Sequence, residues 1–317
     1  RPHRRLFPIT VDQTGEMVRN IPMNHRERIL AAIRRQPVDR IPTDMWATPE
    51  VQEKLLAYFG IQTGRDTPAQ GVSLMGGALS REAHAILEVY DKLDIDGILN
   101  LTPPYIGPTP RSDGDYWENE WGMGYRRQAY GTGVYDEQVH YPLAEAETIA
   151  DLEAYRWPSP DWYDYAALPE NAAPFSDRAI CCGYTAVFYY HNLLRGLELS
   201  LMDPLLRPEF THYLVEHLSG FFTEYHRRCF QAGRGIIDIT QVTDDFGSQH
   251  GLLISPNIFD EFYRRPMQRA IDMAKSYGII VFHHDDGDMR PLLSPLVEMG
   301  IEVLNPIQWR CGTWDLA

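Results

Sequence analysis

The chain has 317 residues, of which 44% are hydrophobic, and its formal net charge is -15 at pH 7. This length allows one large α/β domain or two small ones. The acidic balance argues against a nucleic-acid or anionic-membrane surface, because both require clustered lysine and arginine. No run of about 18 apolar residues exists, so no transmembrane helix is expected.

The cysteines and the N-terminal segment bear on compartment and domain limits. None of the four cysteines forms a CxxC pair, and adjacent Cys181 and Cys182 are poorly placed to bond to each other. This usage suits a reducing, cytoplasmic compartment. Residues 1–22 are basic and loop-like without an apolar signal core, so we expect an extension, a tag or a linker there. The domain is expected to span residues 23–317.

Hydrophobic periodicity predicts that strands and helices alternate along the chain. Asn24 and Ser255 are placed as N-caps of two of the helices. Helices are expected at residues 25–35, 50–59, 81–93, 145–155, 189–199, 208–230, 257–277 and 290–299. Strands are expected at residues 41–46, 95–99, 178–184 and 236–241, and again from near 279 and near 301.

Residues 102–160 interrupt this alternation. They are rich in proline, glycine, tyrosine, tryptophan and charge, with a β-hairpin expected around 117–130. Long segments of this kind in compact domains are usually functional. We therefore interpret residues 102–160 as a loop-rich insertion.

Alternating strands and helices predict a parallel sheet, and at this length a (β/α)8 TIM barrel is the first expectation. The six predicted strands are two fewer than a closed barrel needs. Either the sequence is truncated before the last two strands, or the insertion contains strands that the pattern does not reveal.

The most unusual stretch is residues 283–288, where two histidines and three aspartates follow the apolar run 278–282. In parallel α/β folds the carboxyl ends of the strands are where ligands bind. We interpret this strand end as the active-site edge. The alternative is a polar turn in which Asp286 or Asp288 caps the helix that begins near Met289.

His284 and Asp286 alternate, so in extended backbone their side chains point to the same face. A His-x-Asp pair can bind zinc through nitrogen and carboxylate oxygen, although two ligands do not complete a site. Asp244 and Asp245 either act on a substrate or cap the following loop. Other strand ends contribute polar or aromatic groups, namely Asp44, Trp46, Asn100, Tyr184, Asn305 and Gln308.

Several common catalytic motifs are absent from the sequence. It has no GxxxxGK[ST] phosphate loop, no GxGxxG after a strand and no GxSxG nucleophile elbow. The three lysines, Lys54, Lys92 and Lys275, do not lie at predicted carboxyl ends of strands. A Schiff-base aldolase is therefore not expected.

Four motifs, taken in order, resemble the uroporphyrinogen decarboxylase-like superfamily. They read Thr243-Asp244-Asp245-Phe246-Gly247-Ser248-Gln249, Ile254-Ser255-Pro256, His284-x-Asp286-Gly287-Asp288 and Leu304-Asn305-Pro306-Ile307-Gln308. Further similar segments are Met23 to Pro42, Leu194-Arg195-Gly196, and the insertion from Trp121-Gly122 to Trp157-Pro158. The resemblance runs from Met23 to the end of the chain. It implies a (β/α)8 barrel with about two further strands after Asn305-Pro306.

The superfamily contains porphyrinogen decarboxylases and corrinoid-linked methyltransferases, and this chain departs from both patterns. Decarboxylases carry an arginine-rich segment after the first strand, whereas residues 45–49 contain no arginine to bind carboxylates. The methyltransferases bind zinc through His-x-Cys and a later cysteine. His284 matches the histidine, Asp286 replaces the cysteine, and the later cysteine would lie beyond Ala317. Carboxylate makes the site harder, so the resemblance leaves zinc as an option.

The first hypothesis is a methyltransferase that moves a methyl group from a small methylated substrate to a corrinoid on a separate partner protein. A metal at His284 and Asp286, or protonated Asp286 or Asp288, would polarise the leaving heteroatom. The catalytic candidates are Asp286, His284, Asp288 and Asp244. The substrate-binding candidates are Trp46, Asp44, Tyr184, Asp245, Asn305 and Gln308.

Two alternatives remain open, and a homodimer is left open in each case. One is a decarboxylase of a carboxylated substrate, in which Asp44 or Asp244 stabilises a pyrrole-type cation without metal or corrinoid. The other is a non-catalytic barrel that binds a small ligand or a corrinoid partner.

Overall fold

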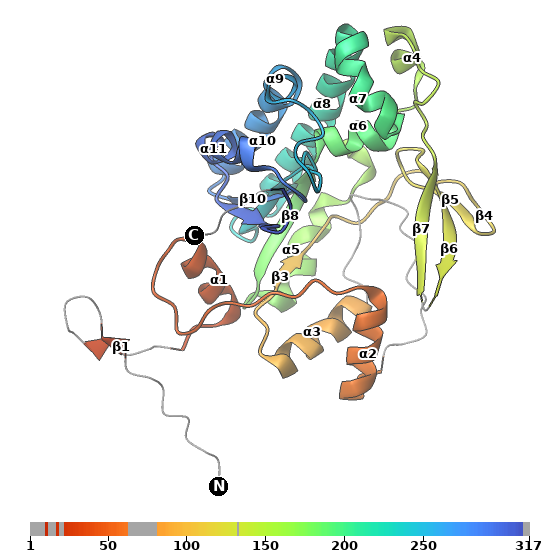
Figure 1. The fold of residues 1–317 in the computed structure, drawn as a ribbon. Coiled ribbons are helices and arrows are strands. Elements are labelled where there is room, and N and C mark those ends of the chain that lie inside the picture. The colour runs from red at the N-terminus through yellow and green to blue at the C-terminus, as the bar shows by residue number, and fades with distance from the viewer. Residues whose placement is uncertain (1–9, 12–16, 19–21, 63–80, 132, 313–317) are drawn as a thin grey trace.

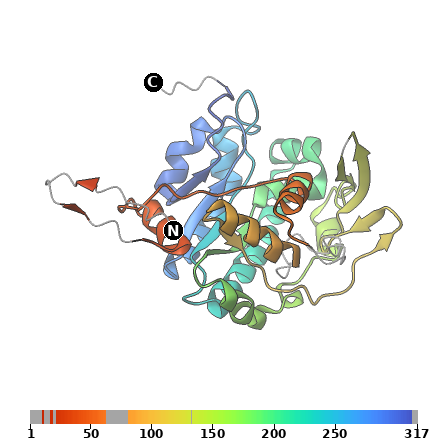
Figure 2. The same cartoon turned by 90° about the horizontal axis from the view of Figure 1, so that it is seen from below.

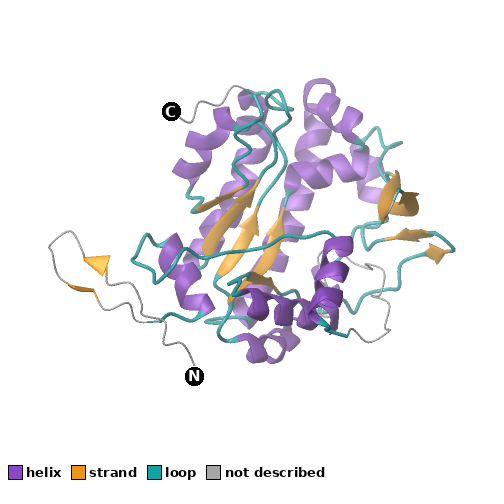
Figure 3. Ribbon diagram, turned by 60° about the horizontal axis from the view of Figure 1, so that its bottom comes forward, coloured by secondary structure: helices purple, strands orange, loops and turns teal. Residues whose placement is uncertain are grey.

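A parallel sheet of five strands lies at the centre of the computed structural model, which describes residues 10–11, 17–18, 22–62, 81–131 and 133–312 (Figures 1 and 3). The order across the sheet is β11-β10-β9-β8-β3, and every adjacent pair is parallel. The strands are β3 (Ile98–Asn100), β8 (Ala179–Thr185), β9 (Ile239–Val242), β10 (Ile280–His284) and β11 (Val303–Asn305). Because spatial order follows chain order, the described residues form an α/β fold with an open, curled sheet, equivalent to part of a barrel.

The strand predicted at residues 41–46 is wrong, because this segment is irregular in the structure. It runs beside β3, where the Thr43 carbonyl accepts hydrogen bonds from the N–H groups of Asp96 and Gly97. The next positions pair through side chains: the Asp96 carboxylate accepts from the Thr43 N–H at 2.9 Å, and the Asp44 carboxylate accepts from the Ile98 N–H at 3.3 Å. These carboxylates replace the backbone partners of a regular β-ladder.

The predicted helices and both predicted N-caps are present. Asn24 accepts a hydrogen bond from the Glu27 N–H at 2.8 Å, and Ser255 accepts from the Ile258 N–H at 3.3 Å. The segment expected as one helix at 189–199 is two helices that meet at Gly196. The helices are α1 (His25–Ile33), α2 (Pro49–Phe59), α3 (Arg81–Leu93), α4 (Ile149–Ala154), α5 (Leu168–Ala172), α6 (Val187–Arg195), α7 (Leu197–Leu206), α8 (Pro208–Ala232), α9 (Pro256–Ile258), α10 (Arg264–Ser276) and α11 (Arg290–Met299). Short turns complete the set: η1 (Pro160–Trp162), η2 (Tyr165–Ala167), η3 (Ala173–Phe175) and the π-helical η4 (Phe259–Tyr263).

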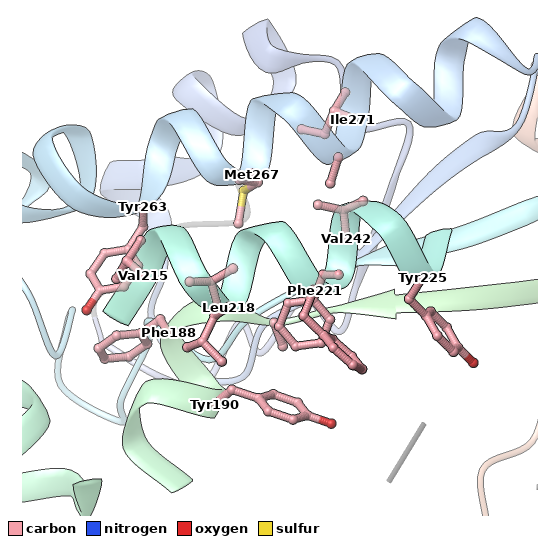
Figure 4. Close-up of a cluster of buried hydrophobic side chains, with 14 of the residues drawn as sticks. Phe188, Tyr190, Val215, Leu218, Phe221, Tyr225, Val242, Tyr263, Met267 and Ile271 are labelled. Atoms are coloured by element: carbon pink, nitrogen blue, oxygen red, sulfur yellow. The ribbon is translucent and has the colours of Figure 1, made fainter. Parts of the chain in front are cut away.

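The two faces of the sheet have separate cores. On the outer face, Val242 packs with Leu218 of α8 and with Met267 and Ile271 of α10 (Figure 4). On the inner face, Ile29 and Leu30 of α1 cover a smaller cluster formed by Ala179, Cys181, Ile239, Ile280 and Phe282. Full burial of each α1 side chain is worth about 1.5–3 kcal/mol. The alternation along β10 places His284 on the same inner face as Ile280 and Phe282.

The insertion forms its own antiparallel sheet, which confirms the hairpin expected around residues 117–130. The strands are β4 (Ser112–Asp113), β5 (Tyr116–Glu118), β6 (Gly124–Tyr130) and β7 (Gly133–His140). Buried Trp121 anchors this segment, because its ring meets Tyr190 of α6 and Phe221 of α8 edge-on at 4.9 and 4.7 Å. Figures 1 and 2 show the insertion on the side of the molecule opposite the N-terminal strands.

The N-terminal segment contributes two short paired strands, β1 (Thr10–Val11) and β2 (Met17–Val18). The rest of residues 1–21, for which an extension or tag was predicted, lies outside the described residues. Among the helices that the structure describes, none combines the length and the hydrophobicity needed to cross a bilayer.

Candidate functional site

Asp245, His284 and Asp286 form a compact cluster, named here the acid–histidine cluster. Each offers one ligand atom, and these atoms all lie within 4.8 Å of one another. His284 Nε2 is 3.8 Å from Asp286 Oδ2. The sequence predicted the pairing of His284 with Asp286. The structure adds Asp245, which follows β9, because β9 and β10 are parallel neighbours whose carboxyl ends meet at one edge.

Polar neighbours fix the position and the orientation of His284. Its N–H donates to Thr243 Oγ1 at 2.9 Å, and the Thr243 hydroxyl donates to the His284 carbonyl. Its Nδ1 lies 3.0 Å from Asn305 Oδ1, which can only accept a hydrogen bond. In the neutral imidazole the proton is therefore on Nδ1, and Nε2 presents a lone pair to the cluster. The Trp46 ring packs 5.4 Å from the imidazole.

Asp286 lies on the loop that follows β10, and its side chain is 56% exposed. Gln308 Nε2 donates to Asp286 Oδ1 at 2.6 Å, and Gln308 Oε1 accepts from the Gly287 N–H at 2.9 Å. The N–H of Asp286 donates to Asp245 Oδ1 at 3.2 Å. One amide side chain and one carboxylate therefore hold this loop in place.

Asp245 is the half-buried member of the cluster. Burial raises the pKa of its carboxyl, the nearby Asp285 and Asp286 carboxylates add to the rise, and the Asp286 N–H opposes it. A bound cation or a proton would compensate this carboxylate. Its electrostatic environment therefore suits either a metal ligand or a proton donor.

Two glycines allow the loops after β9 and β10 to touch. A β-carbon at Gly247 would overlap the carbonyl oxygen of Asp286. Gly287 has a φ of +88°, and a β-carbon there would meet the Ser248 backbone. The buried Asp285 carboxylate joins the same loops by accepting from the N–H groups of Phe246 and Gly247 at 3.2 and 3.0 Å. The glycines of the two motifs thus serve close approach of the backbones.

Asp244 and Asp288, which were predicted as catalytic candidates, are not brought into the cluster. Buried Asp244 accepts from the Tyr189 N–H in the first turn of α6 at 2.7 Å, and burial raises the pKa of its carboxyl well above the usual range. Asp288 makes a two-pronged ion pair with Arg290 at 2.6 and 2.7 Å. The N-cap residue of α11 is Met289, so the alternative in which Asp286 or Asp288 takes that position is wrong.

Aromatic and polar side chains from the inner face adjoin the cluster. Trp46, 60% exposed, donates its indole N–H to Asp44 Oδ2 at 3.1 Å. Tyr184 pairs with Gln241 across β8 and β9, and Gln241 pairs with Phe282 across β9 and β10, so these three side chains share the inner face. Burial raises the pKa of the Tyr184 hydroxyl, which therefore stays neutral.

Two site residues, Thr243 and Gln241, were missed from the sequence. The available signal for Gln241 was one polar residue inside an apolar strand. For Thr243 it was a hydroxyl residue at the end of that strand, a position at which threonine is also common without any site.

Comparisons with known proteins agree with this architecture. The family model for uroporphyrinogen decarboxylase (URO-D) matches residues 186–313, a range that contains the acid–histidine cluster. No curated protein matches the chain in sequence. A solved structure described as a methyltransferase from Methanosarcina mazei shares the fold with a TM-score of 0.54 and 17% identity, covering 89% of this chain and 75% of that chain. The chain thus resembles the uroporphyrinogen decarboxylase-like superfamily, in sequence over residues 186–313 and in fold over most of its length, as its motifs predicted.

Proposed function

We propose that the chain is a methyltransferase that moves a methyl group from a small methylated substrate to a corrinoid on a partner protein. The observation that carries the proposal is the acid–histidine cluster at the carboxyl ends of β9 and β10. The match to the decarboxylase family and the methyltransferase description of the similar structure support it.

The donor atoms of the cluster fit a divalent cation. Asp245, His284 and Asp286 offer one imidazole nitrogen and two carboxylates, a set that zinc and harder first-row ions accept. A zinc ion held by these three residues would act as a Lewis acid toward the leaving heteroatom of the substrate. Asn305 presents the His284 lone pair that such an ion needs.

The protein side chains have separate roles in methyl transfer. The bond between the methyl carbon and its heteroatom breaks, and the heteroatom gains electron density that must be neutralised. In the absence of a metal, a protonated Asp286 or Asp245 does this as general acid, and the raised pKa of Asp245 favours that form. Asp288 is less suited, because its ion pair with Arg290 favours the carboxylate. Trp46 and Tyr184 provide the wall against which the substrate binds.

The alternatives make different demands on this site. A decarboxylase of a substrate with several carboxylates needs cations, whereas the described side chains that touch the cluster are amide, acidic or aromatic. A non-catalytic barrel would bind its ligand without turnover. Methyl transfer therefore remains the function that the geometry supports best.

Two measurements test the proposal. Elemental analysis of the wild-type protein and His284→Ala should find a stoichiometric divalent metal that the variant loses. Methylation of cob(I)alamin, followed by its absorbance with methoxylated, methylthio and methylamine substrates, should be lost in Asp286→Ala while the far-UV spectrum is unchanged. Wild-type turnover in Asp286→Ala would contradict the proposal. Gln249→Leu, which changes an exposed amide in the loop after β9, is the matched control.

A further inference from the structure

Two carboxamide side chains, Asn305 and Gln308, contact the ligands of the acid–histidine cluster. Asn305 ends β11 and pairs with His284 in the register between β10 and β11. Its carbonyl accepts from the Asp285 N–H at 3.1 Å, which fixes the two strand ends relative to each other. This pairing places Asn305 Oδ1 3.0 Å from His284 Nδ1.

The chemistry of this contact determines which imidazole nitrogen carries the proton. An amide oxygen accepts hydrogen bonds and cannot donate, so it selects the form of His284 that is protonated at Nδ1. A neutral imidazole has one N–H, which leaves Nε2 as a lone pair facing Asp286. Without the acceptor, the two tautomers would compete, and one of them would place a proton on the ligand atom.

Gln308 acts in the same way on Asp286. Its Nε2 donates to Asp286 Oδ1 at 2.6 Å, while the other carboxylate oxygen, Oδ2, is the one near His284. Gln308 Oε1 accepts from the Gly287 N–H at 2.9 Å and from the Cys311 thiol at 3.3 Å. Both ends of this amide are therefore engaged within the protein, which leaves little capacity for a substrate.

We propose that Asn305 and Gln308 are positioning residues for a divalent cation rather than the substrate contacts predicted from the sequence. Asn305 fixes the tautomer of His284, and Gln308 fixes the carboxylate of Asp286 together with its loop. The cation part rests on the proposed function, because the ion is the one that the acid–histidine cluster would hold. The tautomer part does not depend on it.

The first experiment measures the His284 tautomer in metal-free protein at a pH where the imidazole is neutral. With ¹⁵N-labelled histidine and a His284→Gln variant for assignment, NMR of the full chain should show the proton on Nδ1. Asn305→Leu, which removes the acceptor at similar size, should shift the population toward the other tautomer. Asn305→Asp, which keeps an acceptor, should restore the wild-type pattern. An unchanged tautomer in Asn305→Leu would overturn the role of Asn305.

The second experiment measures Zn²⁺ affinity by competition with a chromophoric chelator. Asn305→Leu and Gln308→Met should each bind Zn²⁺ about 10- to 100-fold more weakly, the range typical for groups that orient metal ligands. Asn305→Asp should retain affinity, and the matched control Gln249→Met should be unchanged. Wild-type affinity in Gln308→Met would overturn its role. If the wild-type protein binds no Zn²⁺, the metal site is wrong, and the tautomer measurement still decides the role of Asn305.

Discussion

Thr243 and His284 are joined by two hydrogen bonds that use both sides of one threonine hydroxyl. The oxygen accepts from the His284 N–H at 2.9 Å, and the hydroxyl donates to the His284 carbonyl. Both residues lie where parallel strands leave the sheet, and Thr243 is only 3% exposed. This contact replaces the backbone ladder at the strand end, so it determines where the imidazole enters the site.

The first prediction is that Thr243→Val destabilises the protein and displaces His284. Valine has nearly the same shape but leaves the buried His284 N–H without its acceptor, at a cost of about 1–3 kcal/mol in the free energy of unfolding. Urea unfolding measures this loss, and Zn²⁺ affinity should fall in parallel. Thr243→Ser keeps the hydroxyl and serves as control. Equal stability of the valine and serine variants would show that the joint is unimportant.

The second prediction concerns Gly247, where the loops after β9 and β10 meet. Gly247→Ala should lower both the free energy of unfolding and the Zn²⁺ affinity, because the added methyl group would overlap the Asp286 carbonyl. The matched control is Gly220→Ala in the exposed interior of α8, where a β-carbon meets nothing within 4 Å. That change should stabilise the helix by about 1 kcal/mol. Calorimetric melting temperatures should therefore move in opposite directions in the two variants.

The sequence predicted the sheet and part of the cluster for identifiable reasons. The apolar runs that form β8, β9 and β10 are periodic and bounded by turn residues, so they could be recognised locally. His284 and Asp286 share a face because they alternate. Asp245 and Asp244, in contrast, are adjacent, and their roles separate only through tertiary partners: Asp244 binds the Tyr189 N–H, and Asp245 faces Asp286.

The wrong strand at residues 41–46 has a similar cause. Its composition suits a strand, but the carboxylates of Asp44 and Asp96 take hydrogen-bonding positions that a ladder would use. Those carboxylates are separated by 52 positions in the sequence, which no local pattern reveals. Asp288 shows the same limit, since its pairing with Arg290 depends on rotamers rather than on spacing.

The third prediction is an acid-sensitive anchor at α1. Hydrogen bonding to the Arg28 guanidinium holds the pKa of Asp39 well below its usual range. Burial works to raise the pKa of Asp96, but hydrogen bonds from Thr43, Arg28 and other donors outweigh it, and the net pKa is lowered. A carboxyl with a depressed folded pKa stabilises the protein above its unfolded pKa of about 3.9, and this contribution is lost as the pH falls toward the folded value.

Urea unfolding at pH 7 and pH 3 tests this anchor. The free energy of unfolding of the wild-type protein should fall between the two values. Asp39→Asn should be less stable at pH 7 and should show a smaller fall, because the titrating group is gone. The exposed Asp113 in β4 supplies the control Asp113→Asn, which should keep the wild-type dependence. An Asp39→Asn profile parallel to wild type would remove Asp39 from this account.

The last prediction separates function from stability at Trp46. Its side chain is 60% exposed, so Trp46→Ala should change the free energy of unfolding by no more than about 0.5 kcal/mol. Its ring nevertheless packs 5.4 Å from the His284 imidazole, beside the presumed path of the substrate. Methyl transfer should therefore lose kcat/KM by at least tenfold, a barrier increase of about 1.4 kcal/mol. Tyr58→Ala removes another exposed ring, on α2, and should leave both quantities unchanged. If Trp46→Ala instead unfolds at markedly lower urea with unaltered kcat/KM, the ring serves packing of residues 41–48 against the sheet and does not form the wall of the substrate site.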